Sequence, residues 1–291
     1  MRLRALAGAL ACCGLALCGC GGGEDPAAAG DGGLGVVTTS YPLQYLAEQV
    51  GGERARVENL IAPGADAHDA DVSPRQLAQV VDADVVVHLS GLQPAVDDVL
   101  GTRPPEHLVD AAAVADLDRD PHFWLDPLRM AQVGRDVAAE LGEVDPDGAA
   151  AYEESAERLA ADLQALDGEF EQALAGCAGA TLVTSHEAFA YLAERHDLRQ
   201  VGIAGIDPGV EPSPARVRDV LGVVREGGVS TIFFEATANP AVAELLAEEL
   251  GVATAVLHPI ERVAEDQTYP QLMRENLAAL RAGLPCARPA G

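Results

Sequence analysis

From residue 34 onward, short apolar or alternating segments take turns with segments of helical periodicity. Continuous apolar runs bounded by turn residues are typical of strands in parallel sheets. In the first half, we predict strands at 35–40, 56–61, 84–89 and 108–109, and helices at 43–50, 74–82, 92–100 and 127–141. In the second half, we predict strands at 181–184, 198–203, 230–234 and 254–257, and helices at 187–195, 214–226, 240–250 and 269–282. Strand–helix alternation of this kind predicts an α/β fold with parallel sheets.

The segment between the two halves has the composition of one long helix. Asp145-Pro146 is typical of a helix start, with an N-cap Asp and Pro at the first helical position. From there to about Ala175 the chain is rich in Ala, Leu, Glu and Arg, and a helix of roughly thirty residues would be about 45 Å long. We therefore predict two similar α/β lobes, 34–144 and 177–291, joined by one rigid linker helix over 145–176. The ligand site is expected in the cleft between the lobes, at the carboxyl ends of the strands.

The N-terminus has the features of an export signal. Two arginines precede an apolar run over residues 6–17, which is too short to span a bilayer as a helix. The run ends in Leu17-Cys18-Gly19-Cys20, which resembles a lipobox with Cys20 as the lipidated residue. We predict a lipoprotein signal peptide over 1–20, a lipid anchor on Cys20, and a flexible Gly- and Ala-rich tether over 21–33. The alternative is an ordinary cleaved signal and a free secreted protein.

The charge of the chain argues against nucleic acid as a partner. The 291 residues include 19 basic residues, all of them Arg, and 46 acidic residues, for a net charge of −27. Loss of the signal with its two arginines leaves 17 − 46 = −29. Binding to phosphate backbones needs basic surface, so we expect no nucleic-acid partner.

Two of the six cysteines lie beyond the predicted lipid anchor, Cys177 and Cys286. An exported protein meets an oxidising environment, in which a disulfide between them is chemically reasonable. We predict this disulfide, and the alternative is two separate buried thiols.

Four histidines carry the candidate chemistry. His68, His186 and His258 lie just past a predicted strand or in the loop that leaves it, and His122 lies in a turn before a helix. Because each lobe contributes two of them, they would surround a small cation in the cleft with neutral imidazoles, which zinc accepts at about 2.0–2.1 Å. The remaining histidines are interpreted as surface residues, His107 and His196, or as buried and structural, His88.

Short motifs around these histidines span essentially the whole chain beyond the signal. They lie at 39–43, 63–69, 120–127, 184–192, 211–214, 233–235, 257–261 and 273–277. In type and order they resemble the metal-binding solute-binding lipoproteins of bacterial zinc and manganese ABC importers. The resemblance implies two lobes, a rigid linking helix, and capture of a metal ion without catalysis.

The resemblance also implies the ligands. His68, His122 and His186 match three of the family's ligand positions, whereas the fourth position is commonly acidic and here is His258. Either His258 completes a four-histidine site, which we expect, or it swings away and water or a nearby carboxylate binds instead. Glu235 is expected to orient one ligating imidazole, as such ligands usually require. Its alternative role is to cap the helix that follows.

The ligand types favour zinc over manganese. Imidazole suits zinc, copper and nickel, whereas manganese sites normally recruit carboxylates. One observation runs the other way: the segment 111–119 is short and has no His, so it lacks the long His- and acid-rich loop of many zinc members, which removes a zinc marker without supplying a manganese one. We expect a monomer that carries Zn²⁺ as its transported ligand, with Mn²⁺ as the alternative, to the permease of an ABC importer.

Three other functions are alternatives for a chain with these features. A surface adhesin on the same scaffold is one alternative, and a binder of metal chelates is another. An extracytoplasmic zinc hydrolase is the third, but the sequence has no His-Glu-x-x-His helix.

Overall fold

The computed structural model describes residues 33–286, except 69, 116–119, 208, 236–240 and 265. The predicted signal peptide, the lipidated Cys20 and the tether up to residue 32 lie outside the described residues. The described residues belong to one compact unit, Gly33–Gly291. Among them, no helix combines the length and the apolar character needed to cross a membrane.

The first sheet has four parallel strands in the order β2-β1-β3-β4. Its strands are β1 (Leu34–Thr38), β2 (Ala55–Asn59), β3 (Val85–His88) and β4 (Leu108–Asp110). Its helices are α1 (Tyr41–Gly51), α2 (Pro74–Asp82) and α3 (Pro94–Thr102), with short 3-10 turns η1 (Gly52–Arg54) and η2 (Ala111–Ala113). All of β3 is buried, as expected for a continuous apolar strand in a parallel sheet.

The second sheet repeats this plan in the order β6-β5-β7-β8. Its strands are β5 (Thr181–Thr184), β6 (Arg199–Gly202), β7 (Thr231–Glu235) and β8 (Ala253–Leu257). Its helices are α6 (Ala190–Arg195), α7 (Pro214–Glu226), α8 (Ala241–Leu250) and α9 (Tyr269–Gly283). The predicted architecture of two parallel α/β sheets is confirmed. In each sheet the strand order reverses between the first and third strands, which is where open α/β sheets place their ligands.

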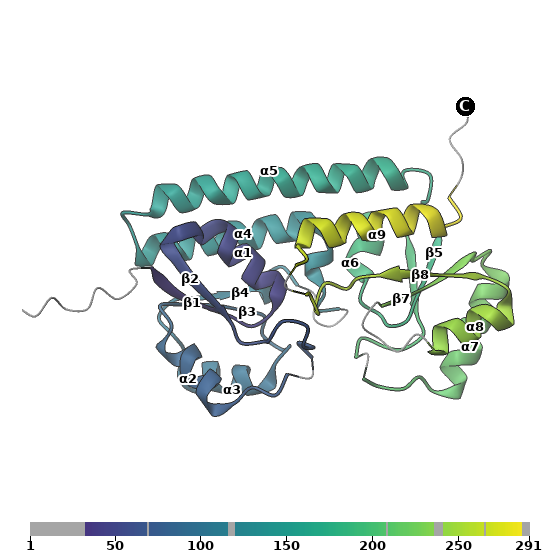
Figure 1. Cartoon of the computed structure of the whole chain (residues 1–291), viewed down its shortest axis with the longest axis horizontal. Helices are drawn as coiled ribbons and strands as arrows, with labels where there is room; N and C mark the ends of the chain where they lie inside the picture. Colours follow the sequence, from purple (N-terminus) through teal and green to yellow (C-terminus); the bar gives the residue numbers. More distant parts are fainter. Residues whose placement is uncertain are drawn as a thin grey trace, which may run out of the picture. The chain divides into compact units, whose positions relative to one another are not determined.

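Two long helices connect the sheets, α4 (Pro127–Val144) and α5 (Ala149–Leu174), and α5 runs alongside α4 and α9 (Figure 1). The predicted helix start at Pro146 is wrong, because Asp145 ends α4 instead. Its N–H donates to Leu141 O at 2.9 Å, and its carboxylate accepts the Gly148 N–H at 3.1 Å. These bonds form a tight turn, so that α5 begins at Ala149.

One hydrophobic core is continuous through both sheets. It includes fully buried side chains from each half, such as Leu43, Trp124, Phe170, Phe233 and Tyr269. Two smaller clusters fill the opposite faces of the sheets, beneath α2 and α3 and beneath α7 and α8. Because the halves share one core, separating them would expose apolar surface to water. This exposure costs about 25 cal/mol of free energy per Å².

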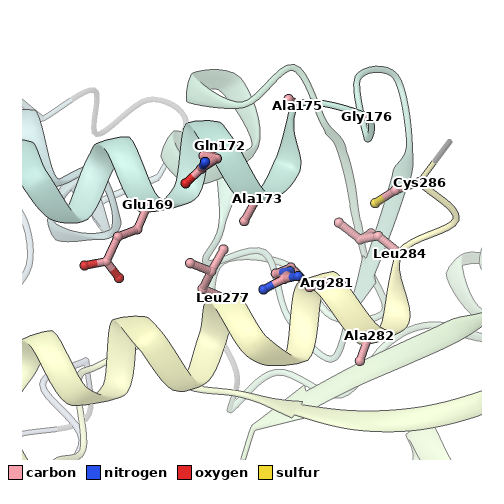
Figure 2. A pocket seen from close by; sticks show the side chains of 10 residues that line it. All are labelled: Glu169, Gln172, Ala173, Ala175, Gly176, Leu277, Arg281, Ala282, Leu284 and Cys286. Atoms are coloured by element: carbon pink, nitrogen blue, oxygen red, sulfur yellow. The ribbon is translucent and has the colours of Figure 1, made fainter. Parts of the chain in front are cut away.

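A disulfide joins Cys177 and Cys286, which are 109 residues apart, and thereby fastens the end of α9 to the segment before β5. Beside it, a groove of about 1110 Å³ lies between α5 and α9, where Leu277 and Arg281 face Ala173 (Figure 2). The groove has none of the predicted histidines in its lining. It is therefore separate from the predicted metal site.

Close packing of α9 against β7 predicts a large cost for a small substitution. A Cβ atom added at Gly283 would lie 2.6 Å from the buried Phe233 ring. We expect Gly283→Ala to lower the free energy of unfolding by about 1–3 kcal/mol through overpacking. Gly168→Ala on α5 is the matched control, because its Cβ would meet no atom within 4 Å and should stabilise the helix by about 0.5–1 kcal/mol. Urea unfolding of both variants measures the difference, and equal effects would contradict this packing.

Candidate metal centre

Loops at the carboxyl ends of the strands bring four side chains from both halves together. His68 lies in the loop between β2 and α2, and His122 directly precedes the 3-10 turn η3 (Phe123–Leu125). His186 follows β5, and Glu261 lies in the turn after β8. Residues far apart in the sequence thus meet because parallel strands end at the same edge of their sheet.

Three of these side chains form a tight cluster. His68 Nε2 lies 3.2 Å from His122 Nε2 and 2.8 Å from Glu261 Oε1. His122 Nε2 lies 2.5 Å from the same carboxylate oxygen. In the described part of the chain, this is the group whose potential ligand atoms all lie within 4.8 Å of one another. Such convergence of imidazole nitrogens and a carboxylate oxygen suits a transition-metal dication.

His186 lies beside this cluster with an unused nitrogen. Its ring centroid is 5.4 Å from that of His122, and its Nε2 is buried without a hydrogen-bond partner. An unsatisfied buried polar atom costs about 1–3 kcal/mol, so the arrangement is explained if another atom binds there. The Nε2 atom of His186 is therefore available to a metal ion.

Two carboxylates orient the buried imidazoles through their other nitrogen. The Asp120 carboxylate contacts His122 Nδ1 and accepts the His122 N–H at 2.8 Å, while its second oxygen accepts the Ala190 N–H at 3.0 Å. Glu235 contacts His186 Nδ1. A carboxylate on Nδ1 fixes the tautomer and leaves Nε2 for a metal. Glu235 lies where the sequence analysis expected an orienting group, whereas Asp120 was missed although it stands two residues before His122.

The carboxylates and imidazoles shift one another's pKa values. Burial would lower the pKa of His122, but the charges of Glu261 and Asp120 outweigh burial and raise it to about 10. Burial would raise the pKa of Glu261, but the His122 and His68 imidazoles hold it well below its usual range. Glu261 is therefore an anion at neutral pH, and the cluster attracts positive charge.

His258 does not join the cluster. Its Nε2 lies 3.3 Å from a carboxylate oxygen of Glu275 on α9. The Asn276 side chain also holds the backbone of His258, accepting its N–H and donating to its carbonyl, both at 2.7 Å. The structure thus corrects the expected four-histidine arrangement, because the turn after β8 presents Glu261 to the other ligands instead. The open alternative of a nearby carboxylate is the one that this geometry fits.

The turn that carries Glu261 is held by contacts from both halves. Ile260 has a φ of 62°, a left-handed conformation that is costly for a β-branched residue. Its neighbour Pro259 accepts a hydrogen bond of 2.7 Å from Trp124 Nε1, and Asn276 holds the turn from α9. Tertiary contacts therefore determine where Glu261 points, and no local sequence signal could have revealed it.

The remaining histidines make other contacts. His88 is buried, as expected, with Nε2 at 2.8 Å from Asp97 and Nδ1 at 3.3 Å from the Thr39 hydroxyl. The two expected surface histidines are half-buried: His107 contacts Glu140 at 2.8 Å, and His196 stacks on Phe170. Their side chains are outside the metal cluster.

The chain is similar to known metal-transport proteins. The model of the family ZnuA, described as zinc-uptake complex component A periplasmic, matches residues 36–283. The zinc-binding lipoprotein AdcA of Streptococcus pneumoniae is 32% identical over 279 residues, covering 86% of this chain and 56% of AdcA. The chain thus spans little more than half of that relative. The high-affinity zinc uptake system protein ZnuA of Bacillus subtilis is 30% identical over 308 residues, covering 94% of this chain and 96% of ZnuA.

A solved structure is similar over nearly all of its length. The laminin-binding protein Lmb of Streptococcus agalactiae, described as bifunctional with adhesin and metal-transporting activity, has a TM-score of 0.77 and 32% identity. The match covers 86% of this chain and 99% of Lmb. With the family match over 36–283 and the relatives at 30% identity or more, this chain belongs to the ZnuA family of zinc-uptake components.

Proposed function

We propose that the protein captures Zn²⁺ outside the cell membrane and delivers it to the permease of an ABC importer. The observation that carries this proposal is the convergence of His68, His122 and Glu261 beside the unpartnered Nε2 of His186. Three imidazole nitrogens and one carboxylate oxygen form a ligand set that zinc accepts in tetrahedral geometry. Membership of the zinc-uptake family supports the same cargo.

Zinc is favoured over manganese by the three imidazoles. Manganese sites prefer carboxylate, carbonyl and water oxygens, whereas imidazole suits zinc. The cluster contains Glu261 where the sequence predicted His258, so the candidate ligands include one carboxylate. Nitrogen donors still outnumber it. The names of AdcA and ZnuA, both described as zinc proteins, support zinc for this chain.

Capture fits the site better than hydrolysis. Catalytic zinc sites keep one coordination position open for water, whereas zinc sites without a catalytic role, such as structural sites, have all four positions filled by protein atoms. Here Glu261 and the imidazoles of His68, His122 and His186 together offer four protein donors, which is enough to fill a tetrahedral site. The site therefore does not support an extracytoplasmic zinc hydrolase.

The location and partners follow from the same proposal. The lipobox-like segment ending at Cys20 and the periplasmic description of the family support an extracytoplasmic protein anchored by lipid. Its partner is the permease of a metal importer, to which it presents its cargo as a monomer. The adhesin activity in the description of Lmb belongs to that protein, and the metal cluster of this chain supports transport.

Metal analysis of the purified protein tests the proposal. We expect one zinc ion per chain, and we expect equimolar Zn²⁺ to displace Mn²⁺ in a competition titration. Zinc that fails to bind would overturn the proposed function, and manganese that outcompetes zinc would overturn the choice of cargo.

Zinc affinity should fall as the pH is lowered from about 7.5 to about 5.5, because a protonated imidazole cannot bind a metal. The pKa of His122 is about 10 without metal, so zinc must displace a proton from it throughout this range. One displaced proton weakens binding roughly tenfold for each pH unit lost. Glu261 stays ionised and adds nothing to this dependence. The check is a chelator competition at each pH, with thermal unfolding of metal-free protein as a control, and pH-independent affinity would contradict the site.

A further inference from the structure

An ion pair crosses between the two halves next to the metal centre. Asp66 stands two residues before His68, and Arg262 directly follows Glu261. Arg262 Nη2 contacts Asp66 Oδ2, and the side chains are 28% and 8% exposed respectively. The other oxygen of Asp66 accepts the His68 N–H at 2.8 Å. The Asp66 carboxylate thus binds the backbone of His68 and the side chain of Arg262, which is the neighbour of Glu261.

Among the described residues, few other contacts hold the segment that carries His68. Residues 62–65 are exposed, and the Gln93 side chain holds the segment from its own half through the Ala67 carbonyl at 3.1 Å. The rings of His122 and His186 are almost fully buried, whereas the His68 side chain is 13% exposed. Among the described residues, no carboxylate contacts His68 Nδ1, unlike the other two imidazoles.

We propose that Asp66 and Arg262 are a positioning pair that holds His68 against Glu261 and thereby slows the loss of zinc. The inference rests on the proposed function, and it assigns to this pair the role that Asp120 and Glu235 have for His122 and His186. The difference is that Asp66 acts through the backbone of His68, and that its other partner belongs to the opposite half.

The pair can hold the His68 segment without contributing to the contacts that join the two halves. The halves are joined by separate buried hydrogen bonds. Trp124 Nε1 donates to Pro259 O at 2.7 Å, and Tyr269 Oη donates to Trp124 O at 2.6 Å. Neither bond involves the pair. Loss of the pair would free the His68 segment, while the shared core and these bonds would keep the halves together.

The strength of the effect follows from the burial of Asp66. Exposed ion pairs contribute little, but removing one partner of a buried pair leaves an uncompensated charge and loosens what it held. Residues that orient metal ligands typically contribute 10- to 100-fold in metal affinity. We expect Arg262→Gln to raise the rate of zinc dissociation about tenfold, at the lower end of that range.

Zinc dissociation into excess chelator, followed by stopped flow, tests the proposal on wild type, Arg262→Gln, Asp66→Asn and the double variant. Arg274→Gln is the matched control, because Arg274 pairs with Glu169 at 2.8 Å between α9 and α5 and does not contact the cluster. Arg262→Lys keeps the positive charge, and we expect it to release zinc more slowly than Arg262→Gln. Thermal unfolding of each metal-free variant shows whether it is folded.

A positioning role requires that Arg262→Gln releases zinc about tenfold faster than Arg274→Gln, and that the double variant releases it no faster than the more severe single variant. Wild-type release rates for both Arg262→Gln and Asp66→Asn would overturn the proposal and leave the proposed function intact. An equal acceleration in Arg274→Gln would also overturn it. If Arg262→Gln fails to fold, Asp66→Asn decides by the same criterion. Absence of zinc binding in the wild type would overturn both proposals.

Discussion

Replacement of Glu261 by Gln is expected to lower zinc affinity by more than about a hundredfold, which exceeds the usual effect of residues that only orient ligands. The substitution keeps the size of the side chain but removes the anionic oxygen that lies 2.8 Å from His68 Nε2 and 2.5 Å from His122 Nε2. A neutral amide oxygen is a weaker ligand for a dication, and the cluster also loses its buried negative charge. Competition titration with a zinc chelator of known affinity measures the loss.

His258→Ala is the matched control for this prediction. Both residues lie in the same turn, but the ring of His258 contacts Glu275 rather than the cluster. Its removal should leave zinc affinity within about threefold of wild type, because it takes away no ligand and no orienting group. A large loss in His258→Ala with little change in Glu261→Gln would show that the four-histidine site of the sequence analysis is the real one.

The second large effect is expected on stability, from loss of the disulfide. The Cys177→Ala, Cys286→Ala double variant removes a link between residues 109 positions apart in the sequence. A cross-link over so long a loop restricts the unfolded chain strongly, and losing a native disulfide typically costs about 2–5 kcal/mol. We expect a decrease of that size in the free energy of unfolding, measured by urea denaturation without metal.

Alanine is chosen because Cys177 is buried, and a serine hydroxyl would add a cost of its own. Wild-type protein treated with a reductant should unfold at the same urea concentration as the double variant. Both should still bind one zinc ion, because neither cysteine contacts the metal cluster. A variant as stable as oxidised wild type would show that the bond does not form in the protein.

The shared core limits the movements by which zinc could enter and leave the proposed site. Trp124 and Tyr269 lie in the core that runs through both halves, and they join the halves by buried hydrogen bonds. Opening the halves as rigid bodies would break these bonds and expose the core. Movement of the exposed segment around His68 would break none of these bonds, which supports the role in zinc release proposed for the Asp66–Arg262 pair.

Much of the architecture was determined by the sequence itself. Apolar runs such as that of β3 predict buried parallel strands, and the helices α2 and α7 begin and end where their sequence signals predict. Both start with a Ser N-cap followed by Pro, which is a local signal that needs no tertiary contact. His68, His122 and His186 could be singled out because each stands at a strand end or loop that the local pattern already predicts.

The tertiary structure decided the candidate fourth ligand Glu261, the orienting role of Asp120 and the ion pair between the halves. Glu261 points at the histidines because Trp124 and Asn276 hold an unfavourable backbone conformation at Ile260. No periodicity of the sequence predicts such a turn, since one of the residues that hold it, Trp124, lies 135 positions from its partner Pro259. Helices and strands follow from residues that are neighbours in the sequence. The direction of a side chain in the cleft depends on the packing of both halves, which exists only in the folded chain.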